Sequence, residues 1–252
     1  MQILSTKLAV PTLRSRLVAR SRLIHELNQG MNCGFVLISA PAGYGKSTLL
    51  RAWVDQTDLA CTWLSLDEGD NHPVRFLAYL TAALRKIDPS VGEALGISLR
   101  ASPLSDIDIL LTPLINELAQ ADLPLCLILD DYHTIQNQLV HQMIGFLLEH
   151  RPALLHLAIA TRADPPLPLS RLRARLQIVE LRGEDLRFST QEVSEFLCRV
   201  MELHLSEADL SGLEVSTEGW IAGLQMAGLT LQGRVDASSF IRSFSGENRY
   251  VF

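Results

Sequence analysis

The chain has 252 residues, of which 48% are hydrophobic and 20% charged, so it can bury a sizeable core and is not a disordered tract. Its net charge of −6 argues against nucleic-acid binding by the chain as a whole. No apolar run reaches the roughly 18 residues of a membrane span. The cysteines form no C-x-x-C pair, which predicts reduced thiols in the cytoplasm and no Cys/His metal site; they are Cys33, Cys61, Cys126 and Cys198.

Strands and helices are predicted to alternate over most of the chain. An extended segment over 1–20 is followed by a short helix at 21–29. Strands are then expected at 34–39, 60–66, 124–129, 154–160 and 176–181, and helices at 46–56, 73–86, 106–120, 137–150 and 168–174. Such alternation favours an α/β fold with a parallel sheet and helices on both faces.

From about residue 189 the pattern becomes purely helical. Ser189 and Glu192 form a capping-box pattern, and further helices are expected near 206–215, 218–232 and 236–243. We therefore expect two domains. The first is a nucleotide-binding domain over 1–183, whose residues 1–30 form an N-terminal arm, and the second is a small helical lid over 184–252.

A phosphate-binding loop is predicted between the strand at 34–39 and the helix at 46–56. Backbone N–H groups of such a loop surround phosphate oxygens, Lys46 would face the β- and γ-phosphates, and the Ser47 hydroxyl would bind Mg²⁺. Ala40 stands where the G-x-x-x-x-G-K-[ST] pattern has its first glycine. The alternative is an ordinary strand–turn–helix with an exposed lysine. The expected nucleotide-binding residues here are Pro41, Ala42, Gly43, Tyr44, Gly45, Lys46, Ser47 and Thr48.

Two carboxylates follow the apolar strand at 124–129. Ligands of open α/β sheets bind at the carboxyl ends of the strands, so Asp130 is expected to hold Mg²⁺ and Asp131 to orient or deprotonate the attacking water. The alternative is that both acids cap the next helix. His133, just past Asp131, is expected to be an ordinary loop histidine, and the alternative is that it approaches the nucleotide.

Arg162 follows the strand at 154–160 and could stabilise charge on the γ-phosphate. The alternative for Arg162 is a surface ion pair with Asp164. A second group of arginines at 171, 173 and 175 is either a solvated helix face or, in a ring-forming motor, an arginine finger.

Several segments together resemble the large ATP-binding, MalT-like regulators of LuxR type, which belong to the STAND class of P-loop ATPases. The phosphate loop alone is less specific than the whole set. The similar segments lie at 4–8, 17–23, 39–47, 66–68, 129–133, 161–162, 185–188 and 218–224. An alanine at position 40 is also at home in this family.

The resemblance implies further roles. Val18 and Arg20 would lie in the segment that lines the adenine pocket; without the resemblance, a basic surface arm is the better interpretation. Arg162 would sense the γ-phosphate. Trp220 falls in the Gly-x-Pro motif that touches the base in related ATPases, but Ile221 replaces the proline, so Trp220 could equally be a core residue.

The expected function is an ATP/ADP switch with Mg²⁺, a weak ATPase that associates with itself depending on the nucleotide. The rival interpretations are a nucleotide-binding scaffold without turnover and an AAA-type motor. Family members continue into a sensor and a DNA-binding domain, and the chain ends at an apolar Phe252, so we expect a fragment of a longer regulator. This fragment itself is expected to bind neither DNA nor membranes.

Overall fold

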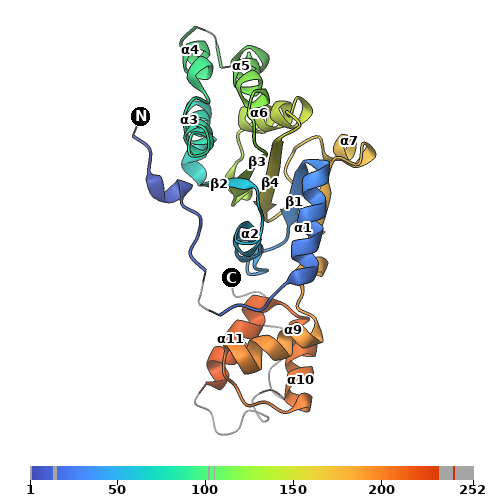
Figure 1. Ribbon diagram of the computed structural model, residues 1–252. Coiled ribbons are helices and arrows are strands. Elements are labelled where there is room, and N and C mark those ends of the chain that lie inside the picture. The colour runs from blue at the N-terminus through green and yellow to red at the C-terminus, as the bar shows by residue number, and fades with distance from the viewer. Residues whose placement is uncertain (1, 14–15, 102, 105, 233–240, 242–252) are drawn as a thin grey trace.

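Five parallel strands form one sheet in the order β2-β3-β4-β1-β5 (Figure 1). The computed structural model describes residues 2–13, 16–101, 103–104, 106–232 and 241. The strands are β1 (Phe35–Ser39), β2 (Ala60–Ser65), β3 (Leu125–Asp130), β4 (Leu155–Thr161) and β5 (Val179–Arg182). The predicted parallel sheet is confirmed. Because β4 lies between β1 and β3, the carboxyl ends of these three strands meet at one edge of the sheet.

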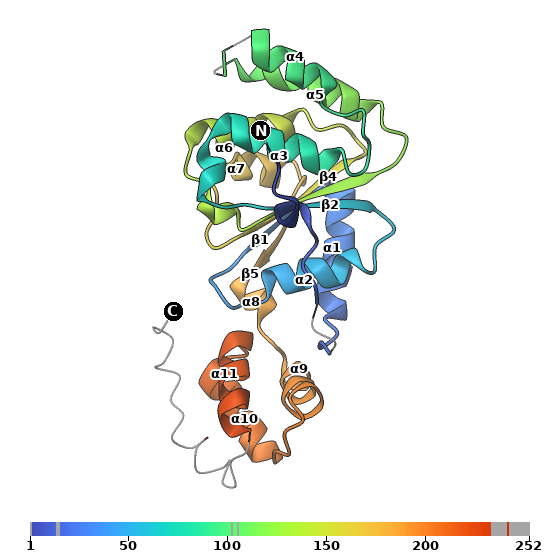
Figure 2. The same ribbon diagram turned by 90° about the vertical axis from the view of Figure 1, so that its left-hand side faces the viewer.

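Helices cover both faces of the sheet, as predicted (Figure 2). Alternate strand residues point to opposite faces, so Phe35 and Leu37 join one buried cluster and Val36 and Ile38 join the other. The first cluster is covered by α3 (Pro73–Leu84), α5 (Ile107–Ala119), α6 (Gln138–Glu149) and α7 (Leu169–Ala174). The second is covered by α1 (Ser21–Cys33) and α2 (Lys46–Val54).

Two helices differ from the sequence-based prediction. The helix α1 continues to Cys33 instead of ending at 29, and Gly30 lies inside it. A Cβ at Gly30 would stand 2.4 Å from Val36 Cγ2, so this glycine lets α1 approach the sheet. The helix α4 (Glu93–Ala101) was not predicted at all.

The last part of the chain forms a small helical bundle with its own buried cluster, built on Val193, Leu197, Leu213 and Leu224. Figures 1 and 2 show these orange and red helices gathered at one end of the molecule. The elements of the bundle are α9 (Thr190–Ser194), a π-helix (Glu195–Val200), α10 (Glu207–Thr217) and α11 (Ile221–Leu231). The short helix α8 (Gly183–Leu186) precedes the bundle, and its Leu186 packs in the second cluster of the sheet domain. The predicted capping box of Ser189 and Glu192 is present. Of the predicted helix at 236–243, only Ile241 belongs to the described residues.

Candidate functional site

The loop between β1 and α2 has the backbone conformation of a phosphate-binding loop. Gly43 and Gly45 have φ values of 76° and 78°, which side chains other than glycine rarely adopt. Gly45 is also the N-cap of α2, so the loop leads directly into a helix N-terminus. That end of a helix favours anions, because its first N–H groups have no partner within the helix.

Lys46 folds back onto this loop. Its Nζ donates to the carbonyl oxygens of Ala40 and Pro41, at 2.8 and 2.9 Å. Burial lowers the pKa of Lys46, and Asp131 acts in the opposite direction. Lys46 is thus a buried cation, rather than the exposed lysine of the alternative interpretation.

Ser47 and Asp130 meet at the edge of the sheet. The Ser47 hydroxyl donates to Asp130 Oδ1 at 3.0 Å, and the Asp131 amide donates to the same oxygen. Burial raises the pKa of Asp130 to about 6. A hydroxyl and a carboxylate are oxygen ligands that suit Mg²⁺, which keeps further positions for water and phosphate. Within the described ranges, no group of three or more His, Cys, Asp and Glu could hold a metal ion by itself.

Asp131 and His133 lie together just after β3. Asp131 has a left-handed backbone with a φ of 55°, and its side chain is about half exposed. His133 Nδ1 lies 3.8 Å from Asp131 Oδ1 and has no hydrogen-bond partner. Burial lowers the pKa of His133, and the charges of Arg162 and Lys46 lower it further, while Asp131 acts to raise it. His133 therefore lies beside the candidate site residue Asp131.

Arg162 follows β4 and makes no hydrogen bond or ion pair within the part of the chain that the structure describes. The alternative partner, Asp164, is instead paired with Arg182 and Arg173. Arg162 acts electrostatically on Lys46 and His133. Its guanidinium is thus available to an anion at the edge of the sheet.

Two cavities adjoin the loop, and Tyr44 and Gln225 line both. The first, of about 660 Å³, is lined by Val18 and Arg20 of the arm, Thr48 of α2 and Phe188 of the bundle. The second, of about 760 Å³, is lined by the loop, Arg162 and the start of α11, including Trp220. The structure therefore brings Val18, Arg20 and Thr48 together around the first cavity, whereas Trp220 lines the second.

Arg20 joins the arm to the bundle. Its guanidinium donates to the carbonyl oxygens of Leu186 and Arg187, and its Nε lies 2.8 Å from Glu192 Oε1. It also lies over the Phe188 ring, 4.4 Å from the ring centre. Burial lowers the pKa of Arg20, while Glu192 acts to raise it. Arg20 thus lines the first cavity and also holds the segment that leads into the bundle.

The start of α11 contacts the phosphate loop directly. Trp220 Nε1 donates to the Ala42 carbonyl at 3.3 Å, and the Ala222 amide donates to the Gly43 carbonyl at 3.2 Å. A Cβ at Gly43 would stand 2.6 Å from Ala222 Cβ. No local sequence signal pointed to Ala222, because this contact joins segments at opposite ends of the chain.

No protein-family model matches the chain. In sequence, the chain is similar to part of several longer proteins. The chain is 35% identical over 246 residues to serine/threonine-protein kinase PknK of Mycobacterium tuberculosis, covering 96% of the chain and 22% of PknK. It is 38% identical over 232 residues to the HTH-type transcriptional regulator MalT of Yersinia enterocolitica, covering 90% of the chain and 25% of MalT. It therefore spans about a quarter of these relatives.

Solved structures share the fold at low sequence identity. A STAND protein of Pyrococcus horikoshii with a tetratricopeptide repeat sensor has a TM-score of 0.61 at 18% identity, covering 91% of this chain and 32% of that chain. A Walker-type ATPase of Pyrococcus abyssi has a TM-score of 0.57 at 15% identity, covering 92% of this chain and 72% of that chain.

The described helices include none that is both long and apolar enough to cross a bilayer. The relatives are similar in sequence to the chain over 90% or more of its length, and the solved structures share its overall fold. By sequence the chain is similar to a segment of MalT-like regulators, and by fold it is a P-loop NTPase domain.

Proposed function

We propose that this module is the ATP/ADP switch of a cytoplasmic, signal-responsive transcriptional regulator. It binds Mg-ATP at the loop over 40–48, hydrolyses it slowly or conditionally, and associates with other copies of itself depending on the nucleotide. The observation that carries the proposal is the direct contact between the loop and α11. Because α11 hydrogen-bonds to Ala42 and Gly43, a movement of the loop on phosphate binding would change these contacts.

Each residue of the proposed site has its own role in binding or hydrolysis. The loop amides and Lys46 hold the phosphates, and Lys46 exchanges its two carbonyl partners for phosphate oxygens. Ser47 and Asp130 hold Mg²⁺, which neutralises phosphate charge. Asp131 orients the attacking water or accepts its proton, and Arg162 stabilises the charge that develops on the γ-phosphate. Val18, Arg20 and Thr48 line the cavity proposed for the nucleoside, whereas Trp220 lines the second cavity and hydrogen-bonds to the loop.

The switch would have two states, with the proposed lid over 184–252 moving relative to the nucleotide domain over 1–183. ADP would maintain the packing of α11 on the loop, and ATP with an inducer would release it. A sensor and a DNA-binding domain on the longer protein would be its intramolecular partners. Because one of the similar proteins is a kinase, the same kind of module could also serve a regulator that phosphorylates its targets.

The motor alternative is less well supported by the arginine contacts. Arg171 is paired with Glu149, and Arg173 with Asp164 and Glu180, which is typical of a charged surface rather than of arginines reserved for a neighbouring subunit.

The test is to extract the nucleotide that co-purifies with the protein, and then to measure turnover and molar mass with ADP and with ATP. Retained ADP, slow turnover and a larger assembly with ATP would support the switch. Bound nucleotide without turnover or change in mass would favour the scaffold, and fast turnover in a ring would favour the motor. A protein without affinity for either nucleotide would contradict all three.

A further inference from the structure

The loop between β2 and α3, residues 67–71, is fixed by its own carboxylates and is here called the acidic loop. Asp67 accepts from the Gly69 amide, and Asp70 accepts from the Asp67 amide, both at 2.9 Å. The Asp70 carboxylate is fully buried. A buried carboxylate is costly unless cations and hydrogen bonds compensate it.

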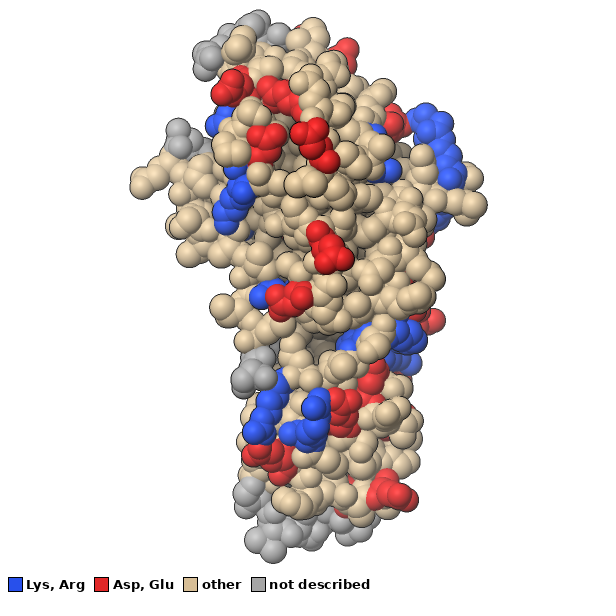
Figure 3. Space-filling view, in the orientation of Figure 1, with Lys and Arg blue, Asp and Glu red and all other residues tan. Residues whose placement is uncertain are grey.

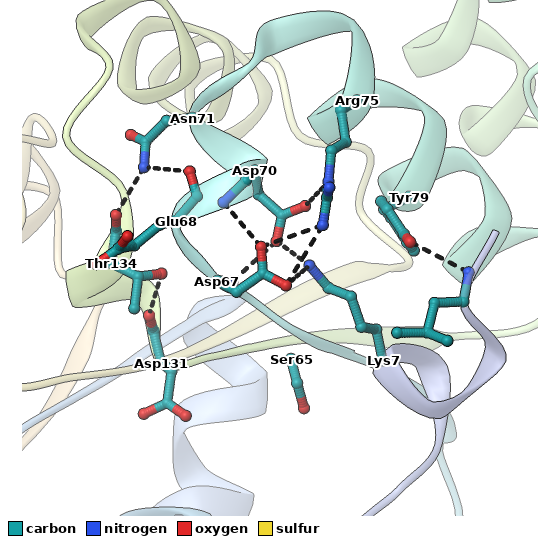
Figure 4. A network of polar contacts seen from close by, with 12 residues as sticks. Lys7, Ser65, Asp67, Glu68, Asp70, Asn71, Arg75, Tyr79, Asp131 and Thr134 are labelled. Carbon is teal, nitrogen blue, oxygen red and sulfur yellow. Dashed lines mark hydrogen bonds and ion pairs between the residues drawn. The ribbon is translucent and has the colours of Figure 1, made fainter. Parts of the chain in front are cut away.

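Two cations compensate Asp70 (Figure 4). Lys7, from the 3₁₀ helix Ser5–Leu8, forms ion pairs with Asp70 and, at 2.9 Å, with Asp67. Arg75 Nε lies 3.3 Å from the other oxygen of Asp70. The Lys7 ammonium also lies over the ring of Tyr79. The acidic loop is therefore tied to the N-terminal segment on one side and to α3 on the other.

Asn71, at the end of the acidic loop, reaches across to the segment after β3. Its Nδ2 donates to the Thr134 carbonyl at 2.8 Å and to the Glu68 carbonyl at 3.0 Å. Its Oδ1 accepts from the amides of Gln136 and Asn137. A side-chain amide has two donors and two acceptor lone pairs, so these four bonds use its full capacity.

The segment that Asn71 holds, residues 131–137, begins with Asp131. Thr134 Oγ1 and the Thr134 amide both donate to the Asp131 carbonyl at 3.0 Å, so the position of Thr134 determines that of Asp131 (Figure 4). At the other end, Asn137 caps α6. Because Asp131 has a left-handed backbone, it depends on its surroundings to keep this conformation.

We propose that Asn71 is a positioning residue for Asp131. Through Thr134, Gln136 and Asn137 it holds the segment 131–137 so that the Asp131 carboxylate stays beside Lys46 and the phosphate loop, and the buried ion pairs of Asp70 hold Asn71 in turn. The inference rests on the proposed function, in which Asp131 acts on the attacking water.

The test compares Asn71→Ala with the wild type in hydrogen–deuterium exchange and in steady-state ATP hydrolysis. Exchange of the amides in 131–137 should rise, because Gln136 and Asn137 lose their acceptor, while exchange in α2 stays unchanged. The kcat should fall about tenfold or more, with KM changed by less than about threefold, since only the position of Asp131 is lost. In an Asp131→Asn background the same substitution should cause no further loss of kcat.

Asn116→Ala is the matched control, because Asn116 is an exposed asparagine on α5. Asn71→Asp keeps an acceptor for the two amides and should retain most of their protection. Unchanged exchange in Asn71→Ala, or a full additional loss of kcat in the double variant, would overturn the inference. A wild type that binds ADP without turnover would contradict the proposed hydrolysis instead, and exchange alone would then decide whether Asn71 holds the segment.

Discussion

At the scale of single residues, Lys46 and Asp130 each have neutral hydrogen-bond partners within the protein. The Lys46 ammonium donates to two carbonyl oxygens, and Asp130 accepts from Ser47 and from the Asp131 amide. Each hydrogen bond that a nucleotide forms with these groups therefore replaces one within the protein. The net free energy of binding from each such bond is smaller than the energy of the bond itself. The affinity for ATP should consequently depend most on the attraction between the Lys46 ammonium and the phosphate charges, which neutral groups do not supply.

Lys46→Ala tests this dependence. Removal of the cation that faces the phosphates should cost on the order of 2–4 kcal/mol of ATP binding. Calorimetric titration with ATP and Mg²⁺ measures it, with Lys46→Arg as a control that retains the charge. Equal ATP affinity for the wild type and Lys46→Ala would contradict the proposed phosphate site.

Asp131→Asn separates binding from turnover. Asparagine tolerates the left-handed backbone at this position, so the substitution removes the negative charge and leaves the conformation in place. ATP binding should persist while hydrolysis falls by about 10²-fold or more. The measurement is single-turnover hydrolysis beside an affinity titration, and an unchanged rate would show that Asp131 is not the catalytic carboxylate.

At the scale of elements, α11 connects the bundle to the phosphate loop. Trp53 and Trp63 are fully buried in the sheet domain, whereas the Trp220 indole is half-buried against Ala42 and lies 6.4 Å from the Tyr44 ring. Because Trp220 is in contact with the loop, its fluorescence should respond to the state of the loop more than that of the other two tryptophans.

We therefore expect ATP and ADP to give different tryptophan emission in the wild type. The difference should disappear in Trp220→Phe, which keeps an aromatic side chain but loses the hydrogen bond to Ala42. Trp53→Phe serves as the control and should retain the difference. A nucleotide-dependent signal that survives in Trp220→Phe would mean that α11 does not follow the nucleotide.

The elements also show what the sequence can predict. The sheet, its phosphate loop and the acidic end of β3 follow from runs of apolar residues and from local motifs, so their expected positions are close to those observed. The helix α4 was missed because its start depends on a distant residue. Glu117 of α5 accepts hydrogen bonds from the amides of Gly92 and Ala94, so the cap of α4 comes from another helix.

The site shows the same limit. The proximity of Ser47 and Asp130 could be predicted, because the phosphate loop and the end of β3 both lie at the carboxyl ends of the parallel strands. The pairing of Arg20 with Glu192, and of Asn71 with the segment 131–137, joins positions that no local pattern connects. Such contacts depend on the packing of whole elements, which periodicity alone does not determine.

At the scale of the whole molecule, buried histidines make the fold sensitive to acid. Burial lowers the pKa of His133, His141 and His156, so the folded state favours their neutral forms. The unfolded chain then binds more protons below the ordinary histidine pKa of about 6.5. Stability from these groups is fully present above that pH and is lost as pH falls. Asp130, with its pKa raised to about 6, acts in the opposite direction.

A single substitution isolates one of these contributions. His141 is buried and shares a hydrogen bond with the Tyr132 hydroxyl. The free energy of unfolding of the wild type should exceed that of His141→Gln by less at about pH 5.5 than at about pH 7.5. Urea unfolding at both pH values measures it, with exposed His204→Gln as the control. A difference that grows at low pH would contradict the assigned direction of the pKa shift.

The charge distribution of the whole molecule bears on DNA binding, because the curated relatives include HTH-type regulators. Duplex DNA requires lysines and arginines gathered on one face and free of competing carboxylates. The net charge is −6, and several arginines are engaged in ion pairs with acidic neighbours, as in Arg171 with Glu149 and Arg182 with Asp164. On the face drawn in Figure 3, blue and red side chains lie among one another.

We therefore expect this module to bind no DNA specifically, with or without ATP. Gel-shift titrations at physiological salt, with operator-sized and scrambled duplexes, measure it. The same titration with added ATP and Mg²⁺ checks whether release of α11 exposes a basic surface. Sequence-dependent binding near or below about 10⁻⁸ M, the range of specific complexes, would show that basic groups of this module recognise DNA despite its acidic balance.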